Sequence, residues 1–325
     1  MDLPTFCTGL TTAFCTGLVI EVIGLLILFP MSLKKLMNLT PDKSKEFFYI
    51  KTQMESNKDE LLLAAGTYGE VYKMFLPPFG FVIKKVSKAG FAPYLRKEMI
   101  AYLILYNSPG VPKVLGSSFD LNEGESHLLL EYIENTQNLA EVLAQQVPVS
   151  SQTVSSIFRQ IFRILKDVHH YGIMHCDLKP ANILYQYGTK NIYIIDFGLF
   201  HFNDRRKTWP MQTEEYRAPE VFAYEKDRRT PVDVKMDMYS VGMILVEFCF
   251  GSELIRVWLR EGKPRDKVDW NEYHRKCRSF ISSFSEKETA FLILLKGLLE
   301  EDPKKRFSPA QALEHLGKQQ EEDPQ

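Results

Sequence analysis

The sequence lacks a regular cysteine pattern. No two cysteines form a Cys-x-x-Cys pair, and the five lie at Cys7, Cys15, Cys176, Cys249 and Cys277. This scatter excludes a disulfide framework and a zinc site of the usual spacing, so we expect a reducing compartment for the folded part. An excess of charge is also missing, because 40 Lys and Arg balance 41 Asp and Glu in 325 residues. The net charge of −1 argues against nucleic-acid binding driven by bulk charge.

Long apolar runs are scarce, and one stands out at residues 10–29, "LTTAFCTGLVIEVIGLLILF". Its length matches the roughly 20 residues that a helix needs to span a bilayer. Glu21 interrupts it, at a cost of roughly 2.5–3.5 kcal/mol on insertion scales. No basic segment precedes the run, which argues against a cleaved signal peptide, whereas Lys34 and Lys35 follow it.

The positive-inside rule therefore places the C-terminal side of this run in the cytosol. We expect the hydrophobic segment 1–40 to anchor the chain in a membrane, with the rest of the chain facing the cytosol. The alternatives are a helix buried against the folded part, or an upstream extension without a functional role. Residues 41–58 are polar and are interpreted as a linker or a peripheral helix.

The folded part begins with strand-like segments. "LLLAAGTYGEVYKMF" and "FVIKKV" are separated by a turn at residues 77–80, and "HLLLEYI" is typical of a buried strand. Between them, "YLRKEMIAYLILY" has helical spacing. Further along, the signals are helical. The pattern predicts an α+β chain with a small β-rich lobe at 59–133 and a larger helical lobe at 134–317.

Three segments carry clear helix signals in the second lobe. "SSQTVSSIFRQIFRILKDVHHYG" has apolar residues every three or four positions, with Gly172 closing the helix. "DMYSVGMILVEFCFG" is apolar all round, which predicts a buried helix. In "SPAQALEHLG", Ser308 is the expected N-cap, Pro309 the first helical residue and Gly317 the end. Residues 318–325 are expected to be a disordered tail.

A glycine-containing turn and a buried lysine are the first candidates for chemistry. Gly66 and Gly69 fall in a turn before Val71, where glycines let backbone amides approach phosphates. A turn with two glycines is common and decides nothing alone. Lys84 follows in the next strand, and a lysine flanked by apolar residues needs an anionic partner. The candidates are phosphates and Glu98, and the alternative is a purely structural Lys84–Glu98 pair.

The segment "MHCDLKPANIL" is a candidate catalytic loop because it places three kinds of polar group within six positions. Asp177 could orient an attacking hydroxyl, and Lys179 could offset charge on a transferring phosphoryl group. Asn182 follows, and Asp196 stands at the end of the apolar strand "IYIIDFG". Asn182 and Asp196 offer the hard oxygen ligands that Mg²⁺ prefers.

Together these motifs resemble the eukaryotic protein kinase family. The order is a glycine-rich turn, a strand lysine, a helix glutamate, His-x-Asp-Leu-Lys-Pro-x-Asn, Asp-Phe-Gly and Ala-Pro-Glu at 218–220. The resemblance covers roughly residues 55 to 317. It implies the two-lobed kinase fold, ATP and Mg²⁺ as cofactors, and a protein substrate. Lys179 and Thr213, ahead of "EYRAPE", are similar to the serine/threonine branch of the family.

The resemblance also implies a role for each matching residue. Asp177 would be the catalytic base beside Lys179, and Asn182 and Asp196 would bind Mg²⁺. His175 would pack against the Asp-Phe-Gly backbone rather than act as a base. Around the nucleotide, the implied contacts are Leu63, Gly66, Gly69 and Val71 over ATP, Lys84 on the α- and β-phosphates and paired with Glu98, Leu130 as gatekeeper, and the Glu131 and Ile133 backbone on adenine. Outside the nucleotide site, the implied structural contacts are Glu220 with Arg306 and Asp237 with the catalytic loop.

The sequence departs from the family pattern at three positions. Ala64 replaces the first glycine of the turn, for which we expect weakened nucleotide binding. Ala181 replaces a frequent glutamate, which removes one reason to expect basic substrates. Cys176 replaces the usual arginine before Asp177, and a cysteine cannot hold a phosphorylated activation loop through charge-assisted hydrogen bonds.

We therefore expect activity that does not depend on phosphorylating the loop "LFHFNDRRKTWPMQTEE". The His-Cys-Asp sequence is locally similar to dual-specificity tyrosine-regulated and homeodomain-interacting kinases, although their Tyr-x-Tyr loop is absent. Two alternatives to an active protein kinase stay open. One is a pseudokinase that serves as a binding scaffold, although pseudokinases usually lack one of the residues found here. The other is a kinase for a small molecule or a lipid, against which the Ala-Pro-Glu segment argues.

Overall fold

The computed structural model describes residues 60–77, 79–118, 126–147, 149–203, 212–251, 263–284 and 290–322. The predicted membrane anchor at 10–29 and the linker at 41–58 lie outside these ranges. Within them, no helix combines the length and the apolar character that crossing a membrane requires.

The described chain divides into two compact units. The first runs to Asn107 and resumes with Pro112–Tyr132, and the second holds Ser108–Val111 and everything from Ile133 onward. The change of unit after Tyr132 comes one residue before the lobe boundary expected from the sequence.

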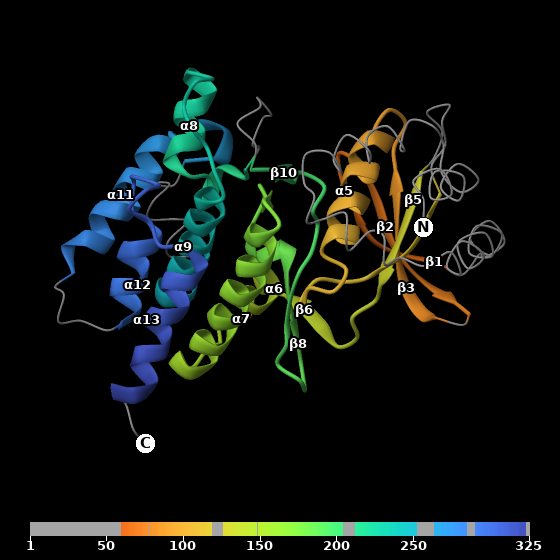
Figure 1. The fold of residues 1–325 in the computed structure, drawn as a ribbon, viewed down its shortest axis with the longest axis horizontal. Coiled ribbons are helices and arrows are strands. Elements are labelled where there is room, and N and C mark those ends of the chain that lie inside the picture. The colour runs from red at the N-terminus through yellow and green to blue at the C-terminus, as the bar shows by residue number, and fades with distance from the viewer. Residues whose placement is uncertain are drawn as a thin grey trace, which may run out of the picture. The chain divides into compact units, whose positions relative to one another are not determined.

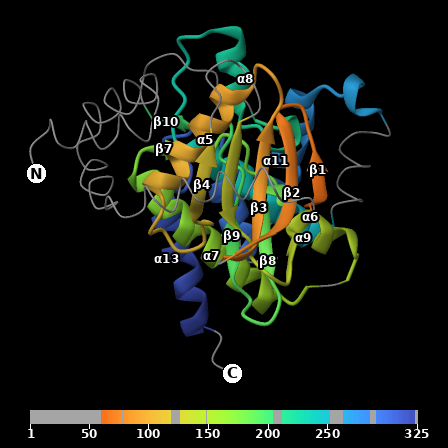
Figure 2. The same cartoon turned by 90° about the vertical axis from the view of Figure 1, so that its right-hand side faces the viewer.

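In its described residues, the first unit is an antiparallel sheet with one helix (Figure 1). Its strand order is β1-β2-β3-β5-β4. Helix α5 (Ala92–Ile104) packs on β3, β4 and β5 (Figure 2). The strands are β1 (Glu60–Ala65), β2 (Gly69–Leu76), β3 (Gly80–Ser87), β4 (Val114–Ser118) and β5 (His127–Glu131). The predicted order of strands, helix and buried strand is confirmed.

Alternation along β3 sorts its side chains onto two faces of the sheet. Val82 lies in a buried apolar cluster with Met74, Leu76 and Leu129. Lys84 has the same parity as Val82, so it shares that face. Residues 83 and 85 point to the other face, where α5 packs.

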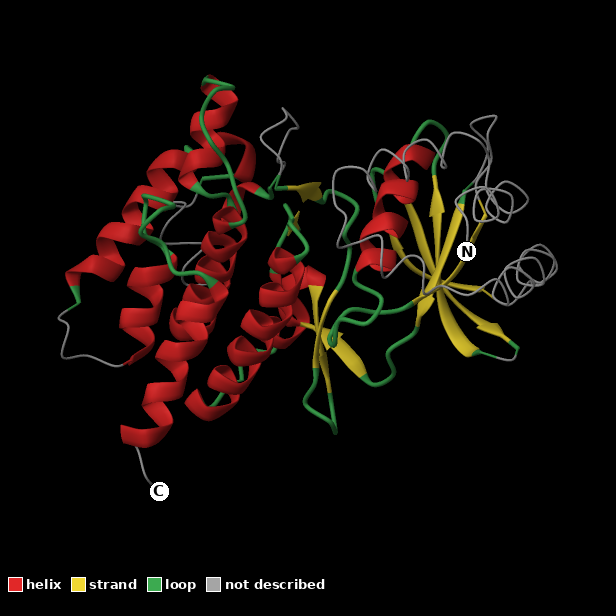
Figure 3. Cartoon of the chain, in the orientation of Figure 1, coloured by secondary structure: helices red, strands yellow, loops and turns green. Residues whose placement is uncertain are grey.

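The second unit is mainly helical (Figure 3). Its helices are α6 (Leu139–Ala144), α7 (Ser151–His170), α8 (Pro219–Lys226), α9 (Lys235–Phe250), α11 (Trp270–Ser283), α12 (Ala290–Leu298) and α13 (Pro309–Glu322). Its short strands are β6 (Thr136–Asn138), β7 (Ile173–Met174), β8 (Ile183–Gln186), β9 (Ile192–Ile194) and β10 (His201–Phe202). Single 3₁₀ turns form at Pro180–Asn182, Glu214–Tyr216 and Arg265–Lys267.

Two helices of this unit follow their sequence signals closely. The Ser150 side chain caps α7 by accepting a hydrogen bond from the Thr153 amide. Helix α7 ends at His170, and Gly172 adopts the positive φ of 70° that glycine tolerates best. Helix α9 is buried on nearly every side, as its continuous apolar sequence predicts.

Helix α13 corrects the expected boundary at Gly317. The helix runs through Gly317 to Glu322, so residues 318–322 of the expected disordered tail are helical, and only the last three lie outside the described residues. A glycine in a helix costs about 1 kcal/mol relative to alanine. Packing of α13 on α7 and α12 outweighs that cost, and Arg159 donates to the Leu316 carbonyl at 3.2 Å.

Candidate active site

The catalytic-loop candidate begins after β7, where a buried carboxylate of α9 holds its backbone. Asp237 accepts hydrogen bonds from the backbone amides of His175 at 2.8 Å and Cys176 at 3.1 Å, and from His169 Nε2 at 3.0 Å. Asp237 is completely buried, so these donors replace the water that its charge would otherwise need. The prediction that Asp237 braces this loop is confirmed.

Cys176 has a left-handed backbone conformation within the loop. Its φ is 67°, in the left-handed region that costs a non-glycine residue about 1–3 kcal/mol. The Asp237 bonds hold the backbone in that conformation. The side chain is fully buried, with Sγ 3.5 Å from the Met174 carbonyl oxygen. A packed thiol of this kind is usually inert.

His175 has a structural role, as predicted. Its Nε2 donates to the Ile195 carbonyl at 3.0 Å, and its Nδ1 accepts from the Asp177 amide at 3.2 Å. The imidazole also packs on Phe197 of the Asp-Phe-Gly segment, with 4.7 Å between ring centroids. Both ring nitrogens are used, so neither is left to accept a proton from a substrate.

Asp177 is held at both carboxylate oxygens. Oδ1 accepts from the Thr213 amide at 3.2 Å and from Thr213 Oγ1 at 2.6 Å. Oδ2 accepts from Lys179 Nζ at 2.6 Å, and the same Nζ lies 3.3 Å from Thr213 Oγ1. The structure therefore brings Asp177, Lys179 and Thr213 into one cluster, as expected for a base, a cation and a substrate-side threonine.

A backbone hydrogen bond brings together the segments that carry Asn182 and Asp196. Asn182 Nδ2 donates to the Asp177 carbonyl at 2.8 Å, which directs the amide oxygen the other way. The Ile195 amide donates to the Asn182 carbonyl at 3.0 Å, and this bond places Asp196 beside Asn182. An amide oxygen and a carboxylate at this point fit a Mg²⁺ ion that keeps other positions for phosphate and water.

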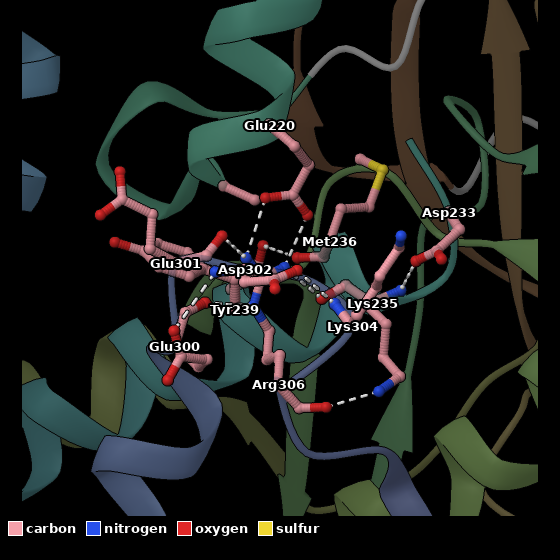
Figure 4. A network of polar contacts seen from close by, with 12 residues as sticks. Glu220, Asp233, Lys235, Met236, Tyr239, Glu300, Glu301, Asp302, Lys304 and Arg306 are labelled. Atoms are coloured by element: carbon pink, nitrogen blue, oxygen red, sulfur yellow. Dashed lines mark hydrogen bonds and ion pairs between the residues drawn. The ribbon is translucent and has the colours of Figure 1, made fainter. Parts of the chain in front are cut away.

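A buried ion pair anchors the segment after Thr213 (Figure 4). The guanidinium of Arg306 forms two parallel bonds with the Glu220 carboxylate, at 2.6 and 2.9 Å, and lies over the Tyr239 ring. Arg306 also donates from Nε to the Glu300 carbonyl at 2.8 Å. The Glu220–Arg306 pair is confirmed, and its forked geometry is the kind that makes a buried pair tolerable.

Comparison with known families decides the assignment of the chain. The model of the protein kinase domain matches residues 58–316, which is most of the chain. The chain belongs to the protein kinase family. The order of its motifs and the geometry of the loop agree with that membership.

Its relatives include serine/threonine kinases of two groups. The kinase is 30% identical to cyclin-dependent kinase B2-2 of Arabidopsis thaliana, over 77% of this chain and 89% of that protein. Identity with cyclin-dependent kinase B2-1 of Oryza sativa subsp. japonica is also 30%, over 77% and 86%. With mitogen-activated protein kinase HOG1 of Kluyveromyces lactis it is 34%, over 53% of this chain and 43% of that protein. The local likeness of the His-Cys-Asp sequence to other kinase groups stays an interpretation.

The lysine paired with Glu98 is not the one predicted. Lys85 Nζ lies 2.6 Å from Glu98 Oε1, whereas Lys84 Nζ lies 2.7 Å from Glu60 Oε1 of strand β1. The predicted Lys84–Glu98 pair is therefore wrong. The reason is strand parity, because adjacent residues of a strand point to opposite faces of a sheet.

Strand register places Lys85 on the same face of the sheet as two residues that were expected at the nucleotide. Val71, which is expected over ATP, pairs directly across the sheet with Lys85, and Tyr72 pairs with Lys84. The expected gatekeeper Leu130 pairs with Ile83, which has the parity of Lys85. Val71, Lys85 and Leu130 therefore share one face of the sheet, and Lys84 lies on the other.

The glycine-rich turn is tied to the segment that follows β3. The Gly66 amide donates to the Gly69 carbonyl at 2.8 Å, and Lys88 Nζ donates to the Gly66 carbonyl at 2.6 Å. A Cβ at Gly69 would lie 2.0 Å from the Val86 carbonyl oxygen, so no other residue fits without moving a strand. Ala64 pairs with Val71 in the sheet beside a register shift, and Leu63 is about half exposed.

Three aromatic rings also connect the glycine-rich turn to the region of helix α5. Tyr68, at the tip of the turn, lies 5.4 Å from Phe91 and 5.1 Å from Tyr94, measured between ring centroids. Phe91 precedes α5 and Tyr94 is in its first turn. The tip of the glycine-rich turn is thus attached to the helix that carries Glu98.

The expected adenine contacts fall at the change of unit. The Glu131 amide, in the first unit, donates to the Lys113 carbonyl at 2.8 Å. Ile133, in the second unit, accepts at its carbonyl from Thr136 Oγ1 at 3.1 Å. Leu130 is buried.

Two buried polar residues near Thr213 were not identified from the sequence. Gln212 is buried, donates to Ser240 Oγ at 2.8 Å and accepts from the Ala218 amide at 2.9 Å. His274 is buried and bonds to the Glu214 carbonyl at 2.8 Å. For His274 the signal in the sequence is a polar residue on the apolar face of α11, and that signal does not identify its partner; Gln212 lies outside any helix or strand and carries no such signal.

Proposed function

We propose that the chain is an active serine/threonine protein kinase that transfers the γ-phosphate of ATP to protein hydroxyls with Mg²⁺. The observation that carries the proposal is the cluster of Asp177, Lys179 and Thr213, with Asn182 bonded to the same loop. A carboxylate fixed at both oxygens beside a lysine suits orientation of an acceptor hydroxyl.

Asp177 would orient the hydroxyl and accept its proton as the hydroxyl oxygen bonds to the γ-phosphorus and the bond from that phosphorus to the leaving ADP breaks. Lys179, at 2.6 Å from Asp177, would offset negative charge on the transferring phosphoryl group. Asn182 and Asp196 would hold Mg²⁺, which supplies charge neutralisation at the phosphates.

In the first unit, we assign the phosphate-binding role to Lys85 in place of Lys84. Lys85 has its Nζ on Glu98 and shares the sheet face of Val71. The other nucleotide contacts are as expected from the sequence, with Leu63, Gly66 and Gly69 over the nucleotide. Glu131 and Ile133 would meet adenine through their backbone.

The direct test is phosphate transfer from labelled ATP by the full-length protein, with Mg²⁺ and a generic protein substrate. An Asp177→Asn variant runs beside it, and general-base removal is expected to lower kcat by about 10²–10⁴-fold. Label on serine or threonine that is lost in the variant supports the proposal. Folded protein that binds ATP without transferring phosphate would instead support the scaffold alternative. Label on a lipid or metabolite alone would support a kinase for a lipid or a small molecule.

We also propose that activity does not require phosphorylation of the activation loop. Three observations support this. Cys176 offers no cation to a phosphate, and the start of the loop is already held by β10, which pairs with β7 through His201 and Met174. Thr213 is bonded to Asp177 without any modification.

Single alanine substitutions separate these roles. Thr208→Ala is expected to leave the rate within about twofold, whereas Thr213→Ala is expected to lower it about 10- to 100-fold, because a hydrogen bond to a charged group is worth roughly 1.5–3 kcal/mol. A large loss at Thr208 would overturn the proposal.

Finally, we propose that residues 10–29 anchor the kinase in a membrane with its catalytic part in the cytosol. The support is the apolar composition and length of this run and the lysines after it. Carbonate extraction of the full-length protein should leave it in the membrane fraction, and a protein lacking residues 1–39 should be released. Equal release of both would contradict the anchor.

A further inference from the structure

His274, on α11, lies beneath the segment that follows Thr213. Its Nε2 is 2.8 Å from the Glu214 carbonyl oxygen. A carbonyl can only accept, so Nε2 carries the proton and donates it. The other nitrogen, Nδ1, is then an acceptor, and it lies 3.2 Å from the Tyr239 hydroxyl. These two contacts fix the tautomer of the ring.

The ionisation states of these groups support the same direction of donation. Burial lowers the pKa of His274 to about 4, so the ring is neutral near pH 7. Burial raises the pKa of Tyr239, so its hydroxyl keeps its proton. Arg278 Nη1 donates to that hydroxyl at 3.2 Å. The chain of donors therefore runs from Arg278 through Tyr239 and His274 to the Glu214 carbonyl.

The end of this chain is one residue from the catalytic cluster. Glu214 follows Thr213, whose amide and hydroxyl both contact Asp177. The Tyr216 amide donates to the Thr213 carbonyl at 2.9 Å and closes the 3₁₀ turn that holds Glu214. A shift of the Glu214 carbonyl would therefore move Thr213 against Asp177.

The surroundings of His274 indicate that its polarity matters. Its ring packs on Tyr273, Tyr239 and Phe222, with centroids 5.1, 5.5 and 5.7 Å away. A phenylalanine would suit such neighbours, whereas a buried polar ring is costly unless it is hydrogen-bonded. Replacing the imidazole by an apolar ring would remove the hydrogen bonds that His274 makes with the Glu214 carbonyl and the Tyr239 hydroxyl.

We propose that His274 is a positioning residue that holds the Glu214 carbonyl, and through it Thr213, in the place required for binding the acceptor segment of the substrate. The proposal rests on the proposed kinase activity. It deepens that activity by assigning the geometry of the peptide side, and not of the nucleotide side, to a relay that begins on α11.

The test compares His274→Phe with His274→Gln in the full-length protein. The phenylalanine keeps the size and packing of the ring and loses both hydrogen bonds. The glutamine keeps an amide that can donate to the Glu214 carbonyl. His315→Phe, the same exchange on α13, is the matched control. Steady-state kinetics with a peptide substrate and with ATP give separate KM and kcat values for each protein.

We expect His274→Phe to lower kcat/KM for the peptide about 2- to 10-fold with an unchanged KM for ATP, because the hydrogen bond to the Glu214 carbonyl is lost. His274→Gln should recover most of that loss, and His315→Phe should match the wild type. An unchanged peptide kcat/KM in His274→Phe would overturn the proposal. Equal losses of kcat/KM for the peptide and for ATP, accompanied by a lower Tm, would also overturn it, because that result indicates a structural role only.

A readout independent of activity separates this proposal from the proposed function. Amide hydrogen exchange over residues 212–217 should be faster in His274→Phe than in the wild type and normal in His274→Gln. If no protein transfers phosphate but exchange changes in this way, the kinase proposal fails and the placement of the Glu214 carbonyl by His274 stands. Unchanged exchange in an active enzyme overturns the positioning role alone.

Discussion

Both units contain ion pairs between a lysine and a carboxylate, and the paired side chains are positioned by different means in each unit. In the catalytic loop, Asp177 is bonded by Thr213, Lys179 and Asn182, while Asp237 holds the backbone just before it. In the sheet, neighbouring lysines of β3 bind carboxylates on opposite faces.

The difference shows what determines each position. In the loop, several partners from distant segments fix one side chain, so its identity and place are defined together. In the strand, backbone alternation alone decides which of two equivalent side chains faces α5.

The largest effect should come from the two lysines. Lys85→Met removes the partner of Glu98 and the proposed phosphate ligand, and loss of such a charged donor is expected to lower kcat/KM about 10²–10³-fold. Lys84→Met, the matched change one residue earlier, should cost less than about threefold. Steady-state phosphorylation at saturating and limiting ATP measures both, with Tm as a check on folding. A larger loss for Lys84→Met would reverse the assignment.

A second prediction concerns the loop. Asp237→Asn keeps the shape of the side chain but places an amide NH₂ group among three donors, two of them backbone amides of residues 175 and 176. We expect kcat to fall about 10- to 100-fold and stability to fall by about 1–3 kcal/mol, because a buried donor is left unsatisfied. Kinetics and urea denaturation check the two effects. Wild-type kcat in this variant would mean that the loop holds itself without Asp237.

The smallest effect is expected at the aromatic cluster of the glycine-rich turn. Tyr94→Ala removes one ring from Tyr68, and an aromatic pair is worth roughly 0.5–1.5 kcal/mol beyond its buried area. The KM for ATP should therefore rise about 2- to 10-fold with little change in KM for peptide. Tyr94→Phe keeps the ring and serves as the control. Identical ATP affinity in all three proteins would show that the turn is positioned without the cluster.

The accuracy of the sequence analysis follows the same division. Asp177, Lys179 and Asn182 could be located because their types and spacing within the loop leave a single alignment, and Thr213 because it precedes the segment "EYRAPE". The lysine of β3 could not, because Lys84 and Lys85 satisfy the same residue type and only strand register separates them. Lys84 lies 13 residues after Val71 and Lys85 lies 14 residues after it.

Other misses have different physical causes. Gly317 was expected to end α13, but packing on neighbouring helices continues the helix, and a local pattern does not contain those contacts. His274 and Gln212 bond to backbone carbonyls of residues far away in sequence, Glu214 and Met236 respectively. Nothing local to either residue identifies such partners.

The positions of the glycine-rich turn differ in how well they tolerate a side chain. Alanine already stands at position 64, and a Cβ at Gly66 would make only an ordinary contact of 3.9 Å with the Gly69 carbonyl oxygen. At Gly69 a Cβ would lie 2.0 Å from backbone oxygen. In a library randomised at all three positions and selected for ATP binding, survivors should diversify at 64 and 66 and retain glycine at 69. The backbone of the neighbouring strand β3, rather than the nucleotide, therefore restricts position 69 to glycine.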